Sequence, residues 1–516
     1  MPSCRKTKAE TKEGPPAATE AHEVWFHRQE ECLEALRRGD PVEVLPTSYA
    51  GNDFVFEFLM GCGLWQVLTS MEPDALKKDN GAPWKALNGV EVIRELARID
   101  RIAHTGKVLS DVRLMLLAGF NAEQVNRTAK VGRFVVDPET LANHLDRISP
   151  RSAQRTFLEH LELLRQHRWI RGKVYAVDGH EIILPYGRKS ERMGKVGEKF
   201  GYKLLLLMNI EEERERAVAF VLAPLHHSER TLLKLLLRGL SRTVGPVREF
   251  VDVLVMDRGY WGARFLLGLK RKYGIDVVTR VQHDELDVVK DVEGVLALGG
   301  SHWESLQEES PRLGTIEVRC TGVPDMVLRD RNAKEVGKIQ VVVADEFDPR
   351  GDPLRNPETG QIRGRWYYGT TLPVVRRPGR IRRYYGRRWT IENQGFRDMT
   401  QKWALDVPAG RRFNLIHSRI AFTLMLYNAD RILRMKFPGT WDEERERLKR
   451  LGVPSPLHGA GLAAYTEDGS LGLLRLQELA TALREQEKRR WIGTLEDAAR
   501  RGVSIEELLE TLRPTD

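Results

Sequence analysis

The order of strand-like and helix-like segments in the middle of this chain limits its fold more than any other feature. Three runs with the composition of β-strands come first, and a helix, a strand, a second helix and a last strand follow them. The expected strands lie at about 173–183, 202–210, 216–225, 250–257 and 276–282, and the expected helices at about 228–240 and 262–273. This mixture of strands and helices predicts an α/β fold.

Two acidic residues stand in or at the end of these strand-like runs. Asp178 interrupts an apolar run, although the pair Asp178-Gly179 is also a usual sequence for a two-residue hairpin turn. Asp257 closes an almost wholly apolar run, as expected of a strand buried on both faces, and α/β folds bind ligands at the carboxyl ends of such strands. Asp257 is therefore predicted to be a site residue. Asp252 lies at the other end of the same run and on the opposite strand face, so we do not predict a role for it.

A third acidic residue, Glu392, follows a run rich in arginine. At 3.6 residues per turn, Tyr385, Arg388, Glu392 and Met399 lie on one stripe of a helix. Nine arginines precede Glu392 with no acidic residue among them, at positions 363, 365, 376, 377, 380, 382, 383, 387 and 388. Such a run predicts a phosphate-binding surface that ends at one carboxylate. The alternative is an ordinary basic helix in which Glu392 pairs with Arg388.

These features together resemble a known family. Acidic residues on the first and fourth strands and on a later helix, in this order of elements, are typical of the RNase H-like fold. Over roughly residues 170–430 the chain resembles the DDE transposases of bacterial insertion sequences, specifically the insertion-sequence-four type. The segments Ala176–Gly179, Met256–Tyr260 and Ile391–Arg397 look like those around the three acids of that family.

The resemblance extends to a signature on the helix of the third acid, Tyr-x2-Arg-x3-Glu-x6-Lys. Its Tyr, Arg and Glu are matched by the stripe residues named above, and Met399 stands where the family has Lys. Lys402 or Arg397 could take over the Lys role of holding the DNA end. Neither lies on the Glu392 stripe of a regular helix, which turns by about 100° per residue.

The resemblance implies that Asp178, Asp257 and Glu392 are the catalytic residues and that they bind two Mg²⁺ ions, which Mn²⁺ can replace. Phosphodiester hydrolysis and rejoining without a covalent intermediate calls for two divalent ions about 3.5–4 Å apart, and hard ions take carboxylate oxygens. Three carboxylates at one site would also repel one another without cations. By resemblance, water frees a 3′-hydroxyl at the transposon end, a hairpin forms on that end, and the hydroxyl finally attacks target DNA.

The resemblance also implies DNA contacts around the third acid. The residues expected to make them are Tyr385, Arg387, Arg388, Lys402 and Trp366. In relatives an aromatic side chain stacks on a flipped base; Trp366 is the candidate here and Trp303 the alternative. The competing interpretation is that residues 366–368 are the last core strand of the sheet.

The rest of the chain is predicted to surround an RNase H-like catalytic core. The expected regions are a disordered tail (1–22), a helical N-terminal region (23–165), the core (166–282 and 376–436), a β-rich insertion (283–375) and a helical C-terminal region (437–516). Residues 116–125 are compatible with a helix-turn-helix for DNA-end recognition. Amphipathic segments are expected near 471–489 and 492–512.

Charge and cysteine content fit this interpretation. A net charge of +9 and a pI near 9.3 favour polyanionic partners. The expected partners are double-stranded DNA, as terminal inverted repeats and target, and a second copy of the chain in a synaptic complex. The four cysteines show no zinc-finger spacing, and no apolar run approaches about 18 residues. We therefore expect a reducing cytoplasm, with the protein on the bacterial nucleoid and not in a membrane.

Two other functions are compatible with the sequence. One is a transposase-derived DNA-binding protein that no longer cuts, which the missing signature Lys favours. The other is an RNase H-fold nuclease that does not join strands, against which the insertion and the arginine-rich run weigh. The three acids favour an active cut-and-paste transposase.

Overall fold

The computed structural model forms two compact units. The terminal unit comprises residues 1–160, 414–422 and 437–516, and the central unit comprises 161–413 and 423–436. The structure describes residues 24–25, 38, 41–47, 49, 51, 53–74, 82–120, 125, 135–185, 190–211, 215–281, 287–310, 314–330, 332–355, 365–439, 446, 461–466 and 471–475. The predicted tail at 1–22, residues 121–124 of the expected helix-turn-helix and residues 476–512 of the amphipathic segments lie outside this set.

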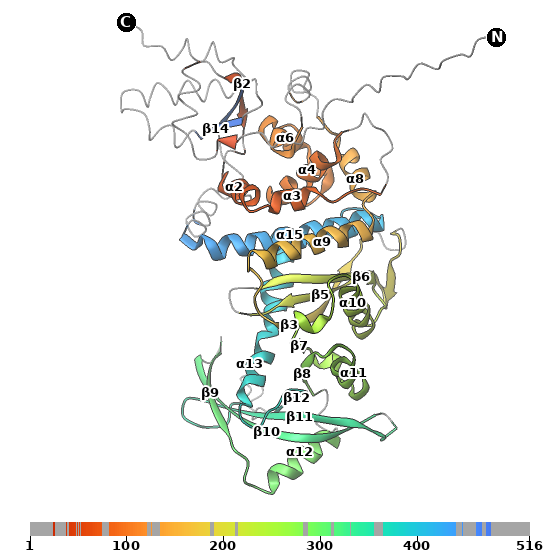
Figure 1. Cartoon of the computed structure of the whole chain (residues 1–516), viewed down its shortest axis with the longest axis vertical. Helices are drawn as coiled ribbons and strands as arrows, with labels where there is room; N and C mark the ends of the chain where they lie inside the picture. Colours follow the sequence, from red (N-terminus) through yellow and green to blue (C-terminus); the bar gives the residue numbers. More distant parts are fainter. Residues whose placement is uncertain are drawn as a thin grey trace, which may run out of the picture. The chain divides into compact units, whose positions relative to one another are not determined.

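A ten-stranded mixed sheet forms the centre of the central unit (Figure 1). Its first part has the order β6-β5-β3-β7-β8, with β7 and β8 parallel to β3 and the other neighbours antiparallel. These strands are β3 (Val174–Ile183), β5 (Lys199–Asn209), β6 (Arg216–Pro224), β7 (Val253–Met256) and β8 (Asp276–Arg280), with a short β4 (Gly194–Val196) beside β5. This is the predicted RNase H-like arrangement. Asp178 lies inside β3, so the alternative of a hairpin turn at Asp178-Gly179 is wrong.

The region predicted as a β-rich insertion continues this sheet. β12 (Trp366–Thr370) pairs antiparallel with β8, and β11 (Glu335–Phe347), β10 (Gly314–Arg329) and β9 (Glu304–Ser310) follow in that order. The register pairs Tyr368 with Arg280 of β8. Residues 366–368 therefore form a strand of the extended core sheet, which was the competing interpretation of this segment.

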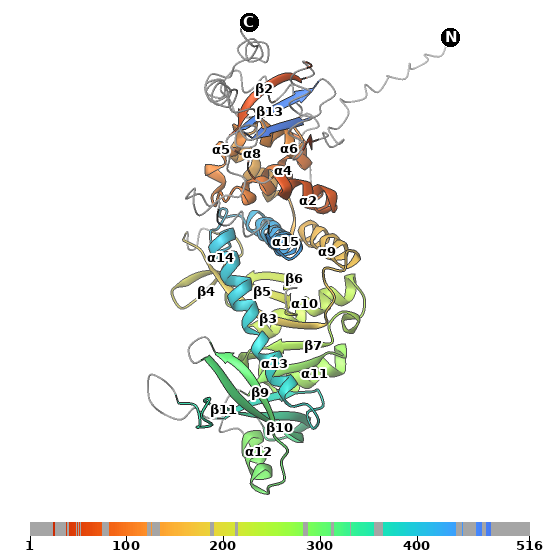
Figure 2. The same ribbon diagram turned by 90° about the vertical axis from the view of Figure 1, so that its left-hand side faces the viewer.

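Helices cover both faces of the sheet (Figures 1 and 2). α10 (Glu229–Thr243) and α11 (Ala263–Tyr273) lie on one face, and α13 (Gly379–Arg387), the π-helical turn η5 (Ile391–Phe396) and α14 (Arg397–Trp403) lie on the other. α10 starts at Ser228, whose side chain accepts a hydrogen bond from the Thr231 N–H, and it buries a leucine stripe against the sheet. Shorter elements are η3 (Val247–Glu249), η4 (Arg258–Tyr260) and α12 (Asp287–Ala297).

The terminal unit combines small helices with a four-stranded sheet. Its helical elements are α2 (Asp53–Gly61), α3 (Leu64–Thr69), α4 (Trp84–Leu96), η1 (Ile102–His104), α5 (Gly106–Leu109), α6 (Val112–Ala118) and α8 (Pro138–Asp146). α9 (Pro150–Gln166) and α15 (Phe413–Lys436) each contribute residues to both units. No helix among the described residues is long and apolar enough to cross a membrane.

The sheet of the terminal unit corrects the prediction of a helical C-terminal region. Its order is β1 (Val24–Trp25), β14 (Leu471–Arg475), β13 (Gly461–Thr466) and β2 (Pro41–Thr47). Residues 471–475 were expected to begin an amphipathic helix. A short apolar run does not distinguish a strand from a helix, and here pairing with β13 and β1 determines the outcome.

A buried ionic cluster lies within the terminal unit. Arg94 on α4 is fully buried, and its guanidinium binds Glu91 at 2.7 Å and Glu95 at 2.6 Å. Arg419 binds the same Glu95 at 3.2 Å. Burial by itself lowers the pKa of Arg94, but the two carboxylates raise this pKa by more than burial lowers it, so the net shift is upward. Two guanidiniums and two carboxylates therefore neutralise one another away from water.

Candidate active site

The register between the parallel strands β3 and β7 brings the first two predicted acids together. Val177 on β3 is paired with Met256 on β7, so the next residues of the two strands, Asp178 and Asp257, lie side by side at the carboxyl end. Asp257 is the N-cap residue of η4, and its carbonyl accepts a hydrogen bond from the Thr279 hydroxyl at 2.9 Å. The fold thus gathers two carboxylates at the edge of the sheet where α/β proteins bind ligands.

The helix over this edge supplies the third predicted acid. Arg388 Nη1 lies 3.5 Å from Asp178 Oδ2 and forms an ion pair with Glu392, four residues further on. The Tyr385 hydroxyl donates to Asp257 Oδ1 at 3.4 Å. Tyr385 and Arg388 therefore connect all three predicted carboxylates to one another.

A fourth carboxylate, Glu229, also faces this site, and the sequence did not reveal it. Glu229 occupies the first turn of α10, where an acidic residue already has a role opposite the helix dipole. A Cβ atom placed on Gly179 would lie 2.4 Å from Glu229 Oε1, so the absence of a side chain at Gly179 makes room for this carboxylate. Lys203 Nζ lies 3.7 Å from Glu229 Oε1. The packing of α10 against β3 and β5 places these residues together.

The surroundings of Asp178 disfavour its charged form. Burial raises the pKa of Asp178 to about 7, and the neighbouring Glu229 and Glu392 add to that effect. The Gly179 N–H, which donates to Asp178 Oδ1 at 2.8 Å, and the Arg388 guanidinium act in the opposite direction. Burial likewise raises the pKa of Tyr260, which lies near Glu229, Asp178 and Asp257. The site carries more negative charge than its own cations offset.

The donor set suits a hard divalent cation, because every candidate ligand is a carboxylate oxygen. Among the residues that the structure describes, however, no three His, Cys, Asp or Glu side chains stand at coordinating distance from one point. The reason is visible in the contacts of Arg388, whose guanidinium lies between Asp178 and Glu392. In this arrangement the Arg388 guanidinium provides the positive charge between these two carboxylates.

The arginine-rich run divides into two groups. Arg365 pairs with Glu293 and Asp345, and Arg382 pairs with Glu308 and Glu346, so these side chains hold the extended sheet together. Four others, Arg376, Arg377, Arg380 and Arg383, are exposed. The predicted phosphate-binding surface is therefore narrower than the sequence suggested, and Arg363 lies outside the described residues.

The π-helical turn η5 changes the geometry that the sequence analysis assumed. A π-helix has i→i+5 hydrogen bonds, so η5 adds about one residue to the turn and rotates everything after Phe396 relative to a regular helix. Met399 is completely buried and does not face solvent. Lys402 pairs with Asp398 at 3.0 Å. Arg397 is exposed directly after η5, so its direction relative to Glu392 no longer follows from regular helical spacing.

The tryptophans considered for base stacking are partly covered by cations. The Arg280 guanidinium lies 4.1 Å from the centroid of the Trp366 ring, and that of Arg365 lies 5.9 Å from the centroid of Trp303. Trp389, which the sequence analysis did not single out, is 54% exposed and directly follows Arg388. The Arg388 guanidinium lies 5.1 Å from the centroid of the Trp389 ring, so this exposed ring also has a cation beside it.

The sheet order and its carboxylates define an RNase H-like protein. The family model described as the transposase DDE domain matches residues 169–429, which include Asp178, Asp257 and Glu392. This chain therefore belongs to the DDE transposase family, whose members generally use divalent metal ions and act on DNA. No curated protein matches the chain.

Proposed function

We propose that this protein cleaves DNA at the ends of a transposable element and joins the freed ends to target DNA by a cut-and-paste route. The observation that carries the proposal is the strand register that sets Asp178 beside Asp257, with Glu392 linked to both through Arg388 and Tyr385. A DNA-binding protein without cleavage activity would have no need for this excess of partly buried carboxylate.

Asp178, Asp257 and Glu392 are proposed to hold two Mg²⁺ ions, or Mn²⁺, which would activate the attacking oxygen and stabilise the leaving oxygen. Arg388 is proposed to release Asp178 and Glu392 when DNA enters and to bind a phosphate of the transposon end. Tyr385, Arg387 and Arg397 lie on or next to the same helical segment and would contact the same backbone. Lys402 and Trp366 would each have to give up a present contact to do so.

Two finer features of the proposal rest on the resemblance to the insertion-sequence-four type. The Tyr-x2-Arg-x3-Glu residues favour a hairpin intermediate on the transposon end. Joining both ends of one element to one target site requires two active sites at the same place, which favours a homodimer in the synaptic complex.

The test is Mg²⁺-dependent cleavage of a duplex that carries the terminal inverted repeat. The sequence of this repeat is taken from the DNA on either side of the gene. Asp178→Ala, Asp257→Ala and Glu392→Ala are each expected to abolish cleavage and to leave binding of the duplex largely intact, because the basic residues remain. Asp252→Ala is the matched control: Asp252 lies at the other end of β7, is exposed and pairs with Lys173 at 3.6 Å. It should cut at the wild-type rate.

Each alternative function predicts a different result for the unmodified protein. Binding of the repeat with no cleavage in Mg²⁺ or Mn²⁺ would indicate a transposase-derived DNA-binding protein. Cleavage with no joined product, when target DNA is present, would indicate a nuclease. Near wild-type cleavage by any of the three alanine variants would show that this residue is assigned wrongly.

A further inference from the structure

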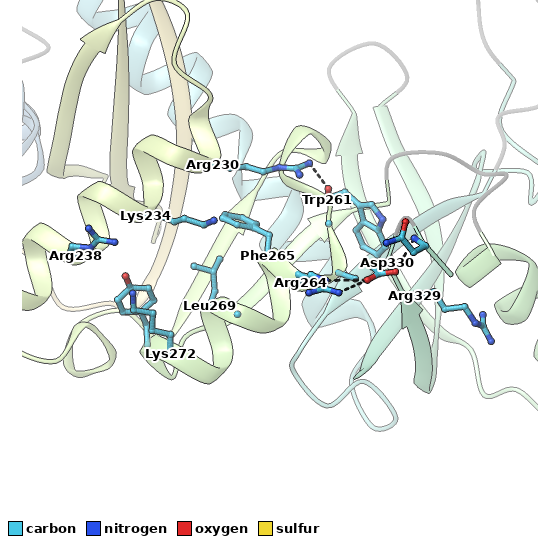
Figure 3. Close-up of a pocket in the computed structure, with 15 residues that line it drawn as sticks. Arg230, Lys234, Arg238, Trp261, Arg264, Phe265, Leu269, Lys272, Arg329 and Asp330 are labelled. Carbon is cyan, nitrogen blue, oxygen red and sulfur yellow. Dashed lines mark hydrogen bonds and ion pairs between the residues drawn. The ribbon is translucent and has the colours of Figure 1, made fainter. Parts of the chain in front are cut away.

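A basic groove lies in the central unit, on the face of the sheet opposite α13 and η5. It has a volume of about 950 Å³ and is bounded by α10, α11 and the end of the β10–β11 hairpin (Figure 3). Six cations line it, against one acid, Asp330. These cations are Arg230, Lys234, Arg238, Arg264, Lys272 and Arg329.

The cations of the groove form rows along its two helices. Arg230, Lys234 and Arg238 are spaced at i, i+4 and i+8 on α10, and therefore share one helical face. On α11, Arg264 and Lys272 have the same i, i+8 relation, and Gly268 lies between them without a side chain. At 1.5 Å per residue the row on α10 extends over about 12 Å. A charge array of that length fits a polyanion better than one phosphate group.

Most of these cations are not neutralised by the protein. Arg264 pairs with Asp330 at 2.6 Å and Arg329 with Asp291 at 3.3 Å. Arg230, Lys234, Arg238 and Lys272 have no carboxylate partner within the described part of the chain. Unpaired cations gathered in a concave site attract anions from a distance and release counterions when anions bind.

The aromatic residues of the groove indicate which part of a nucleic acid it can contact. The Phe265 ring has Lys234 Nζ at 5.6 Å and the Arg230 guanidinium at 5.9 Å from its centroid, and Lys272 Nζ lies 5.1 Å from that of Tyr273. Trp261 is buried. Bases of a single strand need uncovered aromatic faces on which to stack, whereas a duplex presents a continuous row of phosphates.

The groove begins beside the candidate active site. Arg230 donates hydrogen bonds to the carbonyls of Trp261, at 2.5 Å (Figure 3), and Gly259, at 2.8 Å, in the turn that follows Asp257. The helices that carry these rows, α10 and α11, lie on the other face of the sheet from α13 (Figure 2), and α10 starts at Glu229 and α11 six residues after Asp257. DNA in the groove would therefore be a segment other than the one held at Arg388.

We propose that this groove binds the sugar–phosphate backbone of duplex target DNA, without sequence preference. The proposal deepens the proposed function and rests on it, because it assigns a surface to the second DNA segment that joining requires. Backbone contacts of this kind position a duplex and carry no base information.

The test uses the full chain and a duplex that lacks the terminal repeat. Lys234→Glu, Arg238→Glu and Lys272→Glu are combined in one variant; Arg230 is kept because it holds the turn after Asp257. Affinity should fall roughly tenfold or more, and the slope of log affinity against log salt should become shallower by roughly two to three units, close to one for each lost phosphate contact. The control variant combines Arg165→Glu, Arg168→Glu and Lys173→Glu at exposed positions before β3. Its net charge changes by the same amount as that of the groove variant. It should retain the wild-type slope.

An unchanged slope in the groove variant, or an equal loss in the control variant, overturns the proposal. Cleavage of the terminal-repeat duplex is measured in parallel and should stay at the wild-type rate in the groove variant. If the unmodified protein never cuts DNA but the groove variant still binds the duplex with a shallower salt dependence, the proposed function is wrong and the proposal for the groove is supported. If the unmodified protein cuts DNA and the groove variant binds the duplex like the wild type, only the proposal for the groove is wrong.

Discussion

The terminal and central units each hold a cluster in which arginine meets glutamate, and the two clusters differ in charge balance and exposure. In the terminal unit, Arg94 and Arg419 face Glu91 and Glu95, with side chains between 0 and 5% exposed. In the central unit, Arg388 is as buried, but its partners Asp178 and Glu392 are 17% and 36% exposed, with Asp257 and Glu229 close by. The first cluster is balanced, and the second has an excess of acid.

The difference shows how the same residue types serve two purposes. A charge removed from water is tolerated when a partner and hydrogen bonds replace its solvation, and in the terminal cluster two carboxylates stand against two guanidiniums. The central cluster has no such balance, since one guanidinium and one ammonium, Lys203, face four carboxylates. An excess of carboxylates is expected where a protein binds cations. It distinguishes a cation-binding site from an ion pair that only stabilises the fold.

The largest effect is expected from Glu392→Gln, which removes a charge from the unbalanced cluster. Cleavage should fall by about a thousandfold or more because a proposed metal ligand is lost. Thermal stability should not decrease, because repulsion within the cluster is relieved. Parallel measurement of cleavage rate and melting temperature checks both. A variant that melts earlier and still cuts would mean that Glu392 is structural.

The same change in the balanced cluster, Glu91→Gln, should act on stability. It leaves Arg94 buried with one carboxylate fewer, which typically costs about 3–5 kcal/mol of unfolding free energy. Chemical denaturation measures the loss. The control is Arg155→Gln in the exposed pair with Glu72, where the side chains are 57% and 60% exposed, and a change below about 1 kcal/mol is expected. Equal effects at both positions would remove the contrast between the clusters.

Arg388→Lys separates the two roles of the central arginine. Lys keeps the charge but cannot bind two oxygens of a phosphate in parallel, so cleavage should fall roughly ten- to hundredfold while DNA affinity changes little. If Arg388 only steadies the helix through Glu392, cleavage should stay near the wild-type rate. Measuring rate and affinity on the same terminal-repeat duplex decides between these outcomes.

The smallest effect is expected from Arg397→Gln. If the π-helical turn directs Arg397 to DNA, the salt dependence of end binding should become shallower by about one unit. Met399→Lys is the contrasting change: it should destabilise the protein without strengthening binding, because Met399 is buried. A steeper salt dependence in Met399→Lys would show that this position reaches DNA after all.

The sequence predicted those parts of the molecule that depend on local pattern. The apolar runs before Asp178 and Asp257 became β3 and β7, and the order of elements was enough to anticipate the RNase H-like sheet and the meeting of the acids. Glu229 could not be predicted as a site residue because a helix start already accounts for an acid there, and its position depends on the packing of α10 against β3.

Other features depend on interactions that local pattern does not encode. η5 breaks the regular spacing on which the stripe of Glu392 and Met399 was counted. Arg382 looked like a phosphate ligand until the acids of β9 and β11, distant in sequence, were found beside it. Leu471–Arg475 became a strand only through pairing with β13 and β1.

The pairing of β2 with β13 also has a consequence for the order of events during synthesis. Thr47 lies opposite Gly461, and the whole central unit is encoded between them. At about 5–20 residues per second, roughly 20–80 s separate the appearance of these two strands on the ribosome. The central unit has all of its residues before β13 exists, so the sheet of the terminal unit is completed last. A ribosome that stops before β13 would release every residue of the central unit without a finished terminal sheet.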